Sequence, residues 1–347
     1  MPNLENLTPF AAASLPSMSA AAADLLLVVV SGRFHLPPAG AWRTDPPRPT
    51  EEQKPVQLVD EYHGEPDASS LRYEGQSAFV RLATDVHLLG QAWAPGGRAE
   101  KRVDVALVIP HRCSKTVAVF GERVWSQGLG SVSPTSPSPF VSMPLVFERA
   151  FGGAEPGDDP VRDFEPRNPV GRGFSRSASQ ALYQPLPNLE DPRDLIGSYG
   201  DRPTPMGFGP IARSWQPRLG YAGTYDQTWL DAIAPNWPPD FDLRFFQAAP
   251  ADLTITPYLE GGEPVGLTGV APDGDIHFVL PRYRVLLKSY FHRSISRRLM
   301  KLDALQIEPD AGVFTLTWRA AVPLPEGMFE HEHSIVRLLD PWEEAPP

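Results

Sequence analysis

Two groups of acidic residues near large aromatic rings are the first candidates for chemistry in this chain. Glu190, Asp191 and Asp194 lie in the segment LPNLEDPRDL, and Asp240 and Asp242 lie in PPDFDLRFF. A pair of carboxyl groups beside aromatic platforms is the composition of a glycoside hydrolase cleft. The same acids stand among Asn and Pro residues that favour turns. A carbohydrate-active hydrolase that uses these central carboxylates and aromatics therefore remains the alternative function.

Histidine, cysteine and glycine give weaker signals. His331 and His333 alternate with glutamates, as metal ligands on one side of a strand would, but a solvated charged loop near the chain end explains them better. Cys113 has basic neighbours that would lower the pKa of its thiol, although a cysteine in a surface turn needs no activity. The glycines of GRGF and GFGP neither follow a strand nor open a helix, as a phosphate-binding loop would. We expect no catalytic residue, no metal and no cofactor.

Residue types suited to protein binding gather in the stretch 215–246. Interface hot spots favour Trp, Tyr and Arg, and no regular strand has to be built from this stretch. The alternative is that most of these rings form the core of an irregular segment. The predicted partner-binding residues are Trp215, Arg218, Tyr225, Trp229, Asp240, Asp242, Phe245 and Phe246.

A basic run follows nearer the C-terminus. From residue 276 to residue 302 there is no Asp or Glu, while Lys and Arg recur throughout. On a strand, Arg282, Arg284 and Lys288 would share one face. The plain interpretation is the solvated face of an amphipathic strand pair. The sharper hypothesis is a docking patch for an acidic partner.

The elements that must position these residues are mostly strands. The 347 residues include 41 Pro and 28 Gly, a density that breaks most helices and excludes a helical bundle. Apolar residues alternate with polar ones at 86–94 and 103–109, and short turns join such runs, which favours antiparallel pairing. We predict a mainly β protein whose antiparallel sheets, as a sandwich or half-barrel, flank a long irregular Pro- and aromatic-rich segment, 143–250. The one predicted helix is short, near 226–233.

The same patterns suggest a division of the chain. Residues 1–125 are predicted to form an N-terminal antiparallel β domain that includes a strand at 25–36. Residues 126–142, rich in Ser and Pro, are a linker or an exposed loop. Residues 143–323 combine the irregular segment with a C-terminal sheet region. Residues 324–347 are expected to be a loosely attached tail.

Charge and composition limit the partners and the compartment. The net charge of −11 disfavours nucleic acid and anionic membrane surfaces. The single cysteine excludes an intramolecular disulfide and suits a reducing cytoplasm. The first 30 residues contain no Lys or Arg, and their longest uninterrupted apolar run, from Leu25 to Val30, is far too short to span a bilayer. We therefore expect a cytoplasmic protein with no membrane partner.

A series of short motifs runs along most of the chain. The strings are DVHLLG at 85–90, GERVW at 121–125, FERAFGG at 147–153, NPVGRGF at 168–174, LPNLEDP at 186–192, GFGPI at 207–211, WQPR at 215–218, GTYD at 223–226, PDFDLRFFQ at 239–247 and GGE at 261–263. This series resembles that of a bacterial domain-of-unknown-function family, number 2169. Any one string is weak, but their number, order and spacing across roughly residues 20–320 make the resemblance strong.

The resemblance implies a function. Members of that family are encoded beside type VI secretion effectors, especially those with a PAAR-like N-terminal domain, and are thought to act as adaptor chaperones that hold the effector and help load it onto the spike. The resemblance therefore implies a cytoplasmic, non-enzymatic binder of such an effector. The spike protein is the second candidate partner. A third hypothesis is a structural component of the secretion machine itself. The sequence departs from the family in its Ala-rich start and its tail.

Overall fold

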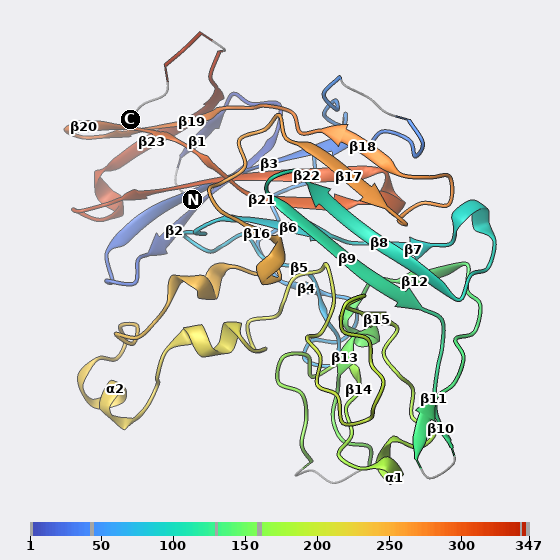
Figure 1. Cartoon of the computed structure of the whole chain (residues 1–347). Helices are drawn as coiled ribbons and strands as arrows, with labels where there is room; N and C mark the ends of the chain where they lie inside the picture. Colours follow the sequence, from blue (N-terminus) through green and yellow to red (C-terminus); the bar gives the residue numbers. More distant parts are fainter. Residues whose placement is uncertain (1–2, 42–44, 129–130, 158–161, 341, 345–347) are drawn as a thin grey trace.

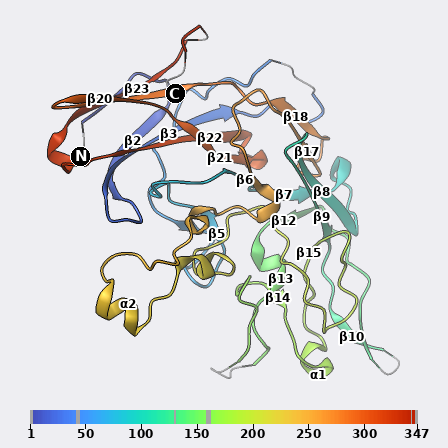
Figure 2. The ribbon, with the colours of Figure 1, turned by 60° about the vertical axis from the view of Figure 1, so that its left-hand side comes forward.

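Strands provide most of the regular structure in the computed structural model of this chain, which describes residues 3–41, 45–128, 131–157, 162–340 and 342–344. Figure 1 shows a body of sheets from which two parts project on the same side, and Figure 2 shows the same arrangement from a second direction. We call the first part the lobe, the described residues among 125–134, 150–188 and 191–202, and the second the arm, residues 219–246. The mainly β prediction is confirmed.

A six-stranded sheet forms one layer of the body. Its longest pairing joins β3 to β22, which places a strand from near the N-terminus against one from near the C-terminus. All its pairs are antiparallel except that of β6 with β21. In spatial order the strands are β16 (Thr254–Ile255), β6 (Thr84–Leu88), β21 (Lys301–Glu308), β22 (Val313–Pro323), β3 (Asp24–His35) and β2 (Ala11–Met18).

A five-stranded antiparallel sheet forms the facing layer. It also combines the two ends of the chain, because β8 pairs with β17. In spatial order its strands are β15 (Leu189–Glu190), β9 (Cys113–Phe120), β8 (Arg102–Ile109), β17 (Pro264–Thr268) and β18 (Ile276–Val279).

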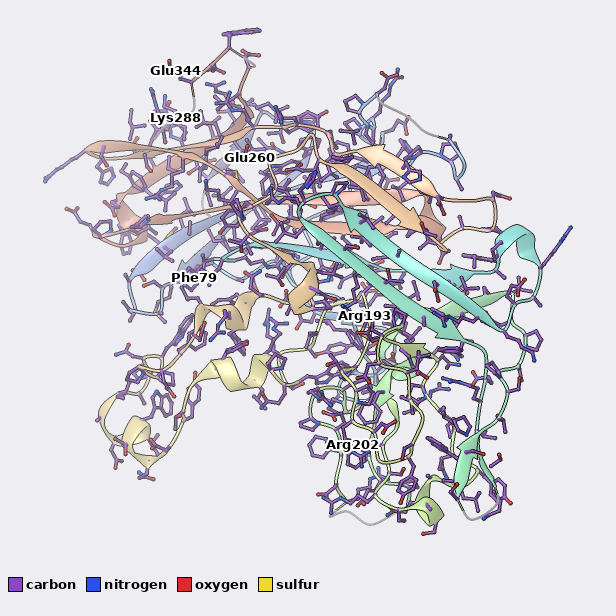
Figure 3. All side chains as sticks on the ribbon, in the orientation of Figure 1. Phe79, Arg193, Arg202, Glu260, Lys288 and Glu344 are labelled. Carbon is purple, nitrogen blue, oxygen red and sulfur yellow. The ribbon has the colours of Figure 1, made fainter. Side chains whose placement is uncertain are left out.

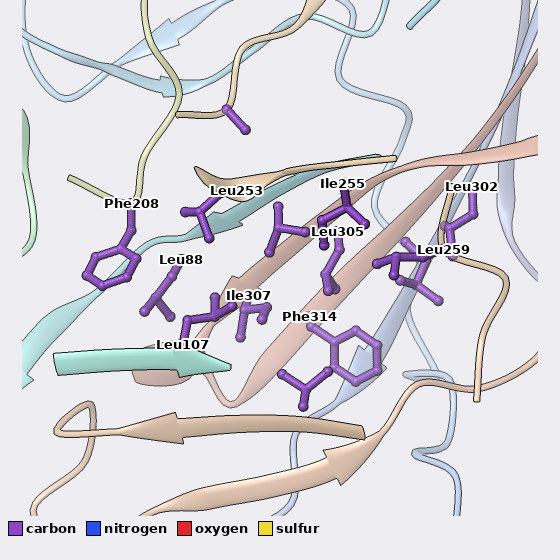
Figure 4. Close-up of a cluster of buried hydrophobic side chains, with 14 of the residues drawn as sticks. Leu88, Leu107, Phe208, Leu253, Ile255, Leu259, Leu302, Leu305, Ile307 and Phe314 are labelled. Carbon is purple, nitrogen blue, oxygen red and sulfur yellow. The ribbon is translucent and has the colours of Figure 1, made fainter. Parts of the chain in front are cut away.

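The main hydrophobic core lies between these two sheets (Figure 4). Leu107 of β8 faces Leu88 and Ile307 of the six-stranded sheet, and all three are fully buried. The ring of Phe278 on β18 packs against that of Phe314 on β22, with centroids 4.9 Å apart. Apolar side chains from both sheets meet in this core, and their removal from water drives the two sheets together.

A four-stranded sheet continues the body at its upper left in Figure 1. The pairing of β1 with β23 is parallel, and the other two pairs are antiparallel. One face packs inward through Leu287 and Val336, which are buried. In spatial order the strands are β1 (Leu4–Asn6), β23 (His331–Leu338), β19 (Val285–Phe291) and β20 (Ser294–Leu299).

The lobe is built from short elements around a small core of its own. Trp125, Phe151 and Leu186 are buried together there. Two of the remaining strand pairs and one helical turn belong to the lobe: β10 (Trp125–Gln127) with β11 (Val132–Pro134), β13 (Phe151–Gly152) with β14 (Arg172–Gly173), and α1 (Ala178–Ala181). The other two strand pairs are β4 (Glu61–Tyr62) with β5 (Leu71–Tyr73), and β7 (Gln91–Trp93) with β12 (Ser142–Pro144).

The predicted division of the chain does not describe this architecture. A boundary after residue 125 would cut both large sheets, because strands from 1–125 pair with strands from 254–323 and share one core with them. The stretch 126–142 is likewise not a linker between domains. Apart from residues 129–130, which lie outside the described residues, it follows the hairpin of β10 and β11 and returns to the body at β12.

The tail also differs from its prediction. Residues 331–338 form β23, which lies between β1 and β19, so this part of the tail is an interior strand rather than a loose end. His331 and His333 are therefore strand residues and not part of a loop. The middle segment matches its prediction, since its described residues are irregular yet packed, with only short strands and turns.

Candidate partner-binding site

The arm is held to the body at both of its ends by two buried acids. At its start, Nη2 of Arg218 donates to Oε1 of Glu74 at 2.5 Å. At its end, the Gln247 side chain and the Ala248 backbone N–H donate to the Asp85 carboxylate at 2.8 and 2.7 Å. Asp85 lies on β6, so the arm is attached directly to the six-stranded sheet. These contacts define where the arm leaves the body.

A buried ionic network surrounds this attachment. Arg81 donates to the second carboxylate oxygen of Glu74 at 2.6 Å, and its Nε lies 3.9 Å from Asp85. Burial alone would raise the pKa of Glu74, but Arg81 and Arg218 bring it below its usual value. Burial dominates for Asp85 and raises its pKa to about 6, against the opposing effect of Arg81. Charges removed from water in this way must be paired, so these partners depend on one another.

Arg218 is the centre of the attachment and not a surface residue. Its side chain is 2% exposed. Besides Glu74, its guanidinium donates to the carbonyl oxygens of Ile211 at 2.5 Å and Phe245 at 2.8 Å. Trp215 is also buried, with its ring against that of Phe147 at 5.7 Å. Two of the eight predicted partner-binding residues therefore lie in the core beneath the arm.

Aromatic rings fill the base of the arm. Phe241, Phe245 and Phe246 are partly buried and pack against each other and against Trp237, with ring centroids 4.4–5.8 Å apart. Phe79 from the body joins them at 5.4 Å from Phe246 and is labelled beside the arm in Figure 3. Phe245 and Phe246 therefore act chiefly as packing residues, while one side of the cluster remains accessible.

Asp240 joins the two limbs of the arm, and Asp242 orders the local turn at Arg244. Asp240 accepts hydrogen bonds from the backbone N–H and the hydroxyl of Thr224 at 3.0 and 2.7 Å. Asp242 accepts one from the backbone N–H of Arg244 at 2.8 Å and pairs with its guanidinium. Hydrogen bonds from Thr224 lower the pKa of Asp240, and hydrogen bonds from Arg244 lower that of Asp242, so both stay ionised near neutral pH. They shape the arm rather than exchange protons.

The tip of the arm carries a single short helix, α2 (Gln227–Ala232). Asp226 begins it by accepting a hydrogen bond from the backbone N–H of Trp229 at 2.8 Å, so Asp226 and not Thr224 is the capping residue. The Trp229 indole N–H donates to the carbonyl of Asn236, and its ring lies 4.7 Å from that of Tyr225. The tip is thus ordered by its own side chains.

Exposed apolar side chains remain on the arm after this internal packing. Leu219, Tyr225 and Leu230 are about half exposed, at 49, 55 and 58%. All three lie outside any sheet, so the regular structure does not require them. We call these three residues the arm surface. Among the predicted partner-binding residues, Tyr225 is the aromatic one that the structure leaves exposed.

A groove with a volume of 610 Å³ adjoins the arm. Tyr221 and Arg244 line it from the arm, Arg167 and Arg193 from the lobe, and Lys115 from β9. Lys115 is buried and pairs with Asp252 at 2.9 Å, and burial lowers the pKa of its ammonium group. The guanidinium of Arg244 stacks over the Tyr221 ring at 4.4 Å. The groove is therefore a mixed apolar and charged concavity between the arm and the lobe.

Two other acids of the hydrolase alternative, Glu190 and Asp191, have structural partners as well. Glu190 is buried and binds Arg123 and the backbone N–H of Ile196. Asp191 pairs with Arg193 at 2.8 Å, which lowers the pKa of Asp191 through hydrogen bonding. In the described ranges, no group of three or more His, Cys, Asp or Glu side chains is placed to hold a metal ion.

Sequence reasoning missed the residues that hold the arm in place. Glu74, Arg81 and Asp85 carry no motif that marks them as partners of the segment 218–248. The only available signal was Asp85 at the start of the string DVHLLG and Arg218 at the end of WQPR, which both belong to the motif series. The contacts that attach the arm are long-range in the sequence, since Arg218 binds Glu74, and Asp85 binds Gln247 and Ala248.

Comparison with known proteins gives one match. The sequence model of a bacterial family described as "Uncharacterized protein conserved in bacteria (DUF2169)" matches residues 21–319. No curated protein and no solved structure matches the chain significantly. The described part of the chain has no helix of sufficient length and apolar character to cross a membrane. Since the match covers most of the sequence, the chain belongs to this family of uncharacterized bacterial proteins.

Proposed function

We propose that this protein is a non-enzymatic adaptor chaperone that binds a type VI secretion effector and helps load it onto the secretion spike. The partner is the effector's PAAR-like N-terminal domain, and the spike protein is a possible second partner. The motif resemblance suggests this function. The observation that carries it is the arm, which is anchored by a buried network yet keeps apolar side chains exposed.

The arm surface and the adjoining groove are the proposed contact region. Tyr225, Leu230 and Leu219 supply apolar contact area, and the ring of Trp229 packs against that of Tyr225. Rigid aromatic anchors cost little conformational entropy on binding, which suits a hot spot. In this proposal the adaptor shields apolar surface on an effector domain that is unstable alone. Such loading takes place in the cytoplasm.

The alternative of a carbohydrate-active hydrolase gains no support from the acids that suggested it. Glu190, Asp191, Asp240 and Asp242 are each engaged by an arginine, a backbone N–H or a threonine. A hydrolase needs one carboxyl group with a raised pKa to act as an acid. The pKa values of Asp191, Asp240 and Asp242 are instead lowered.

Co-purification with the product of the adjacent effector gene tests the proposal. We expect a stable complex and an effector that becomes insoluble or is no longer secreted when the adaptor gene is deleted. An effector that stays soluble and is secreted normally without this protein would refute the adaptor function. Turnover of a polysaccharide by the purified protein would favour the hydrolase instead.

A further inference from the structure

We infer that β20, the outer strand of the four-stranded sheet, is a docking site for an acidic, extended polypeptide segment that adds to the sheet as a fifth strand. This inference goes beyond the proposed adaptor function, because it concerns a different surface and does not depend on the arm. It rests on the open backbone of β20, on its charge and on its exposure.

The backbone of β20 is paired on one side only. Its six residues pair with β19, and β20 is the last strand in the order β1-β23-β19-β20. The Met300 backbone N–H donates to the Val285 carbonyl, which makes that pair hydrogen-bonded. Since hydrogen-bonded and non-hydrogen-bonded pairs alternate in antiparallel ladders, the backbone groups of Ile295, Arg297 and Leu299 point away from β19. They offer a row of donors and acceptors to another strand.

This edge is accessible along most of its length. Ser294, Ile295, Arg297 and Arg298 are all exposed, and Ile295 is 54% exposed. Figures 1 and 2 both place β20 at the outer rim of the molecule, with no other strand beyond it. An added strand would therefore meet no obstacle from the described part of the chain.

The charge of the edge selects an acidic partner. Arg293, Arg297 and Arg298 form no ion pair within the described residues. Lys288 of β19 lies opposite Arg297 and adds another cation on the same face, where Figure 3 labels it. The acids of this sheet, Glu5 on β1 and Glu332 on β23, are separated from β20 by β19. The patch is thus basic on a protein whose net charge is −11.

The same charges disfavour a second copy of this chain as the occupant. Antiparallel pairing of β20 with itself would bring arginines of the two copies close together, and like charges opposite each other destabilise a strand pair. An extended segment with Glu or Asp opposite Arg297 gains attraction instead. Ile295 and Arg297 share one face of β20, so a segment that alternates an acid with an apolar residue presents its acids to that face.

Fluorescence polarisation with a labelled peptide that alternates glutamate with valine tests the inference on the full-length protein. We expect saturable binding that weakens as salt rises, since exposed charges are screened. A peptide with lysine in place of glutamate should not bind. The glutamate peptide with N-methyl groups at alternate residues should also fail, because it cannot pair with a strand edge. Equal binding of either control peptide would overturn the inference.

Two substitutions locate the site on β20. Ile295→Pro removes one outward backbone N–H without a change in charge, and Ile295→Thr keeps that donor. We expect the proline variant to bind the glutamate peptide at least about tenfold more weakly than the threonine variant, at an unchanged melting temperature. If the proline variant does not fold, Arg297→Glu replaces it, with an expected loss of roughly tenfold.

Arg98→Glu is the matched control for Arg297→Glu. Arg98 is exposed, lies in the turn before β8 of the five-stranded sheet and thus outside the sheet that contains β20, and undergoes the same charge change. We expect Arg98→Glu to bind the peptide as the unchanged protein does. An equal loss in both variants would show that only the overall charge matters, and a concentration-dependent dimer that Arg297→Glu strengthens would identify a second copy as the occupant. Either result would overturn the inference.

Discussion

Arg218 shows why residue type alone did not identify the partner surface. Its type suited a hot spot, but its side chain is committed to Glu74 and to two backbone carbonyls inside the molecule. Glu74 lies 144 residues earlier in the chain, a separation that no local pattern spans. Tyr225 was chosen on the same grounds and lies half exposed at the arm tip. Sequence reasoning proposed the segment, and burial separates the residues within it that remain accessible from those that do not.

Loss of the Arg218 guanidinium should destabilise the fold. Arg218→Ala leaves Glu74 buried with one cation fewer, and breaking a buried ion pair in this way costs about 3–5 kcal/mol. The free energy of unfolding from chemical denaturation measures the effect. Arg244→Ala is the control, because Arg244 also pairs with an acid but is exposed, and its loss should leave stability nearly unchanged. Equal denaturation midpoints for the two variants would contradict a stabilising role of the buried network.

Asp85 should make the stability of the protein depend on pH. Its pKa is raised from the ordinary value of 3.8 to about 6 in the folded state, so the folded state binds this proton more tightly than the unfolded state does. The contribution of Asp85 to the free energy of unfolding is fully present below about pH 4 and is lost as pH rises through about 6. It amounts to about 3 kcal/mol. Glu74 has the opposite effect on the pH dependence of stability, because its pKa is lowered in the folded state and its contribution is lost as pH falls.

Comparison with Asp85→Asn isolates this contribution. The variant cannot titrate at this position, so the difference in unfolding free energy between the unchanged protein and the variant should shrink from about pH 4 to about pH 6 and then level off. A difference that stays constant across this interval would mean that Asp85 does not titrate there.

At the scale of elements, apolar runs and alternation predicted the long strands and missed the polar ones. The predicted strands 25–36 and 103–109 correspond to β3 (Asp24–His35), which buries an unbroken apolar run, and β8 (Arg102–Ile109), which buries alternate residues. β2 contains small residues and Pro16, and β20 and β23 are rich in Ser, His and Arg. Such sequences become strands through their neighbours rather than through their own propensity.

The role of β23 as an interior strand predicts a stability difference between adjacent residues. Val336 is fully buried between β1 and β19, whereas Ile335 lies on the other face and is partly exposed. Val336→Ala should lower the free energy of unfolding by about 1–3 kcal/mol through lost burial and a small cavity. Ile335→Ala should cost clearly less. A loosely attached tail would instead leave stability unaffected by either substitution.

At the scale of the whole molecule, the two ends of the chain form the body and the middle forms what projects from it. Strands before residue 125 pair with strands after residue 254, and the lobe and the arm emerge between them. The sequence predicted two β-rich ends and an irregular middle correctly. It could not show that both ends share sheets, because strand partners are determined by contacts across the fold and not by spacing along the chain.

The proposed function assigns a role to this arrangement. A body closed by pairing of its two ends provides a rigid base, and the buried network around Glu74 and Asp85 fixes the direction of the arm. The arm surface is then presented with little loss of freedom on binding. The central claim is that the effector binds to this surface.

Titration of the adjacent effector's PAAR-like domain against Tyr225→Ala tests this claim most directly. Tyr183→Asn is the control, because Tyr183 is exposed on the lobe and its positive φ of 66° is compatible with Asn. We predict that Tyr225→Ala weakens binding by more than about tenfold at an unchanged melting temperature, while Tyr183→Asn binds as the unchanged protein does. Equal affinities for all three proteins would contradict the assignment of the arm as the effector-binding surface.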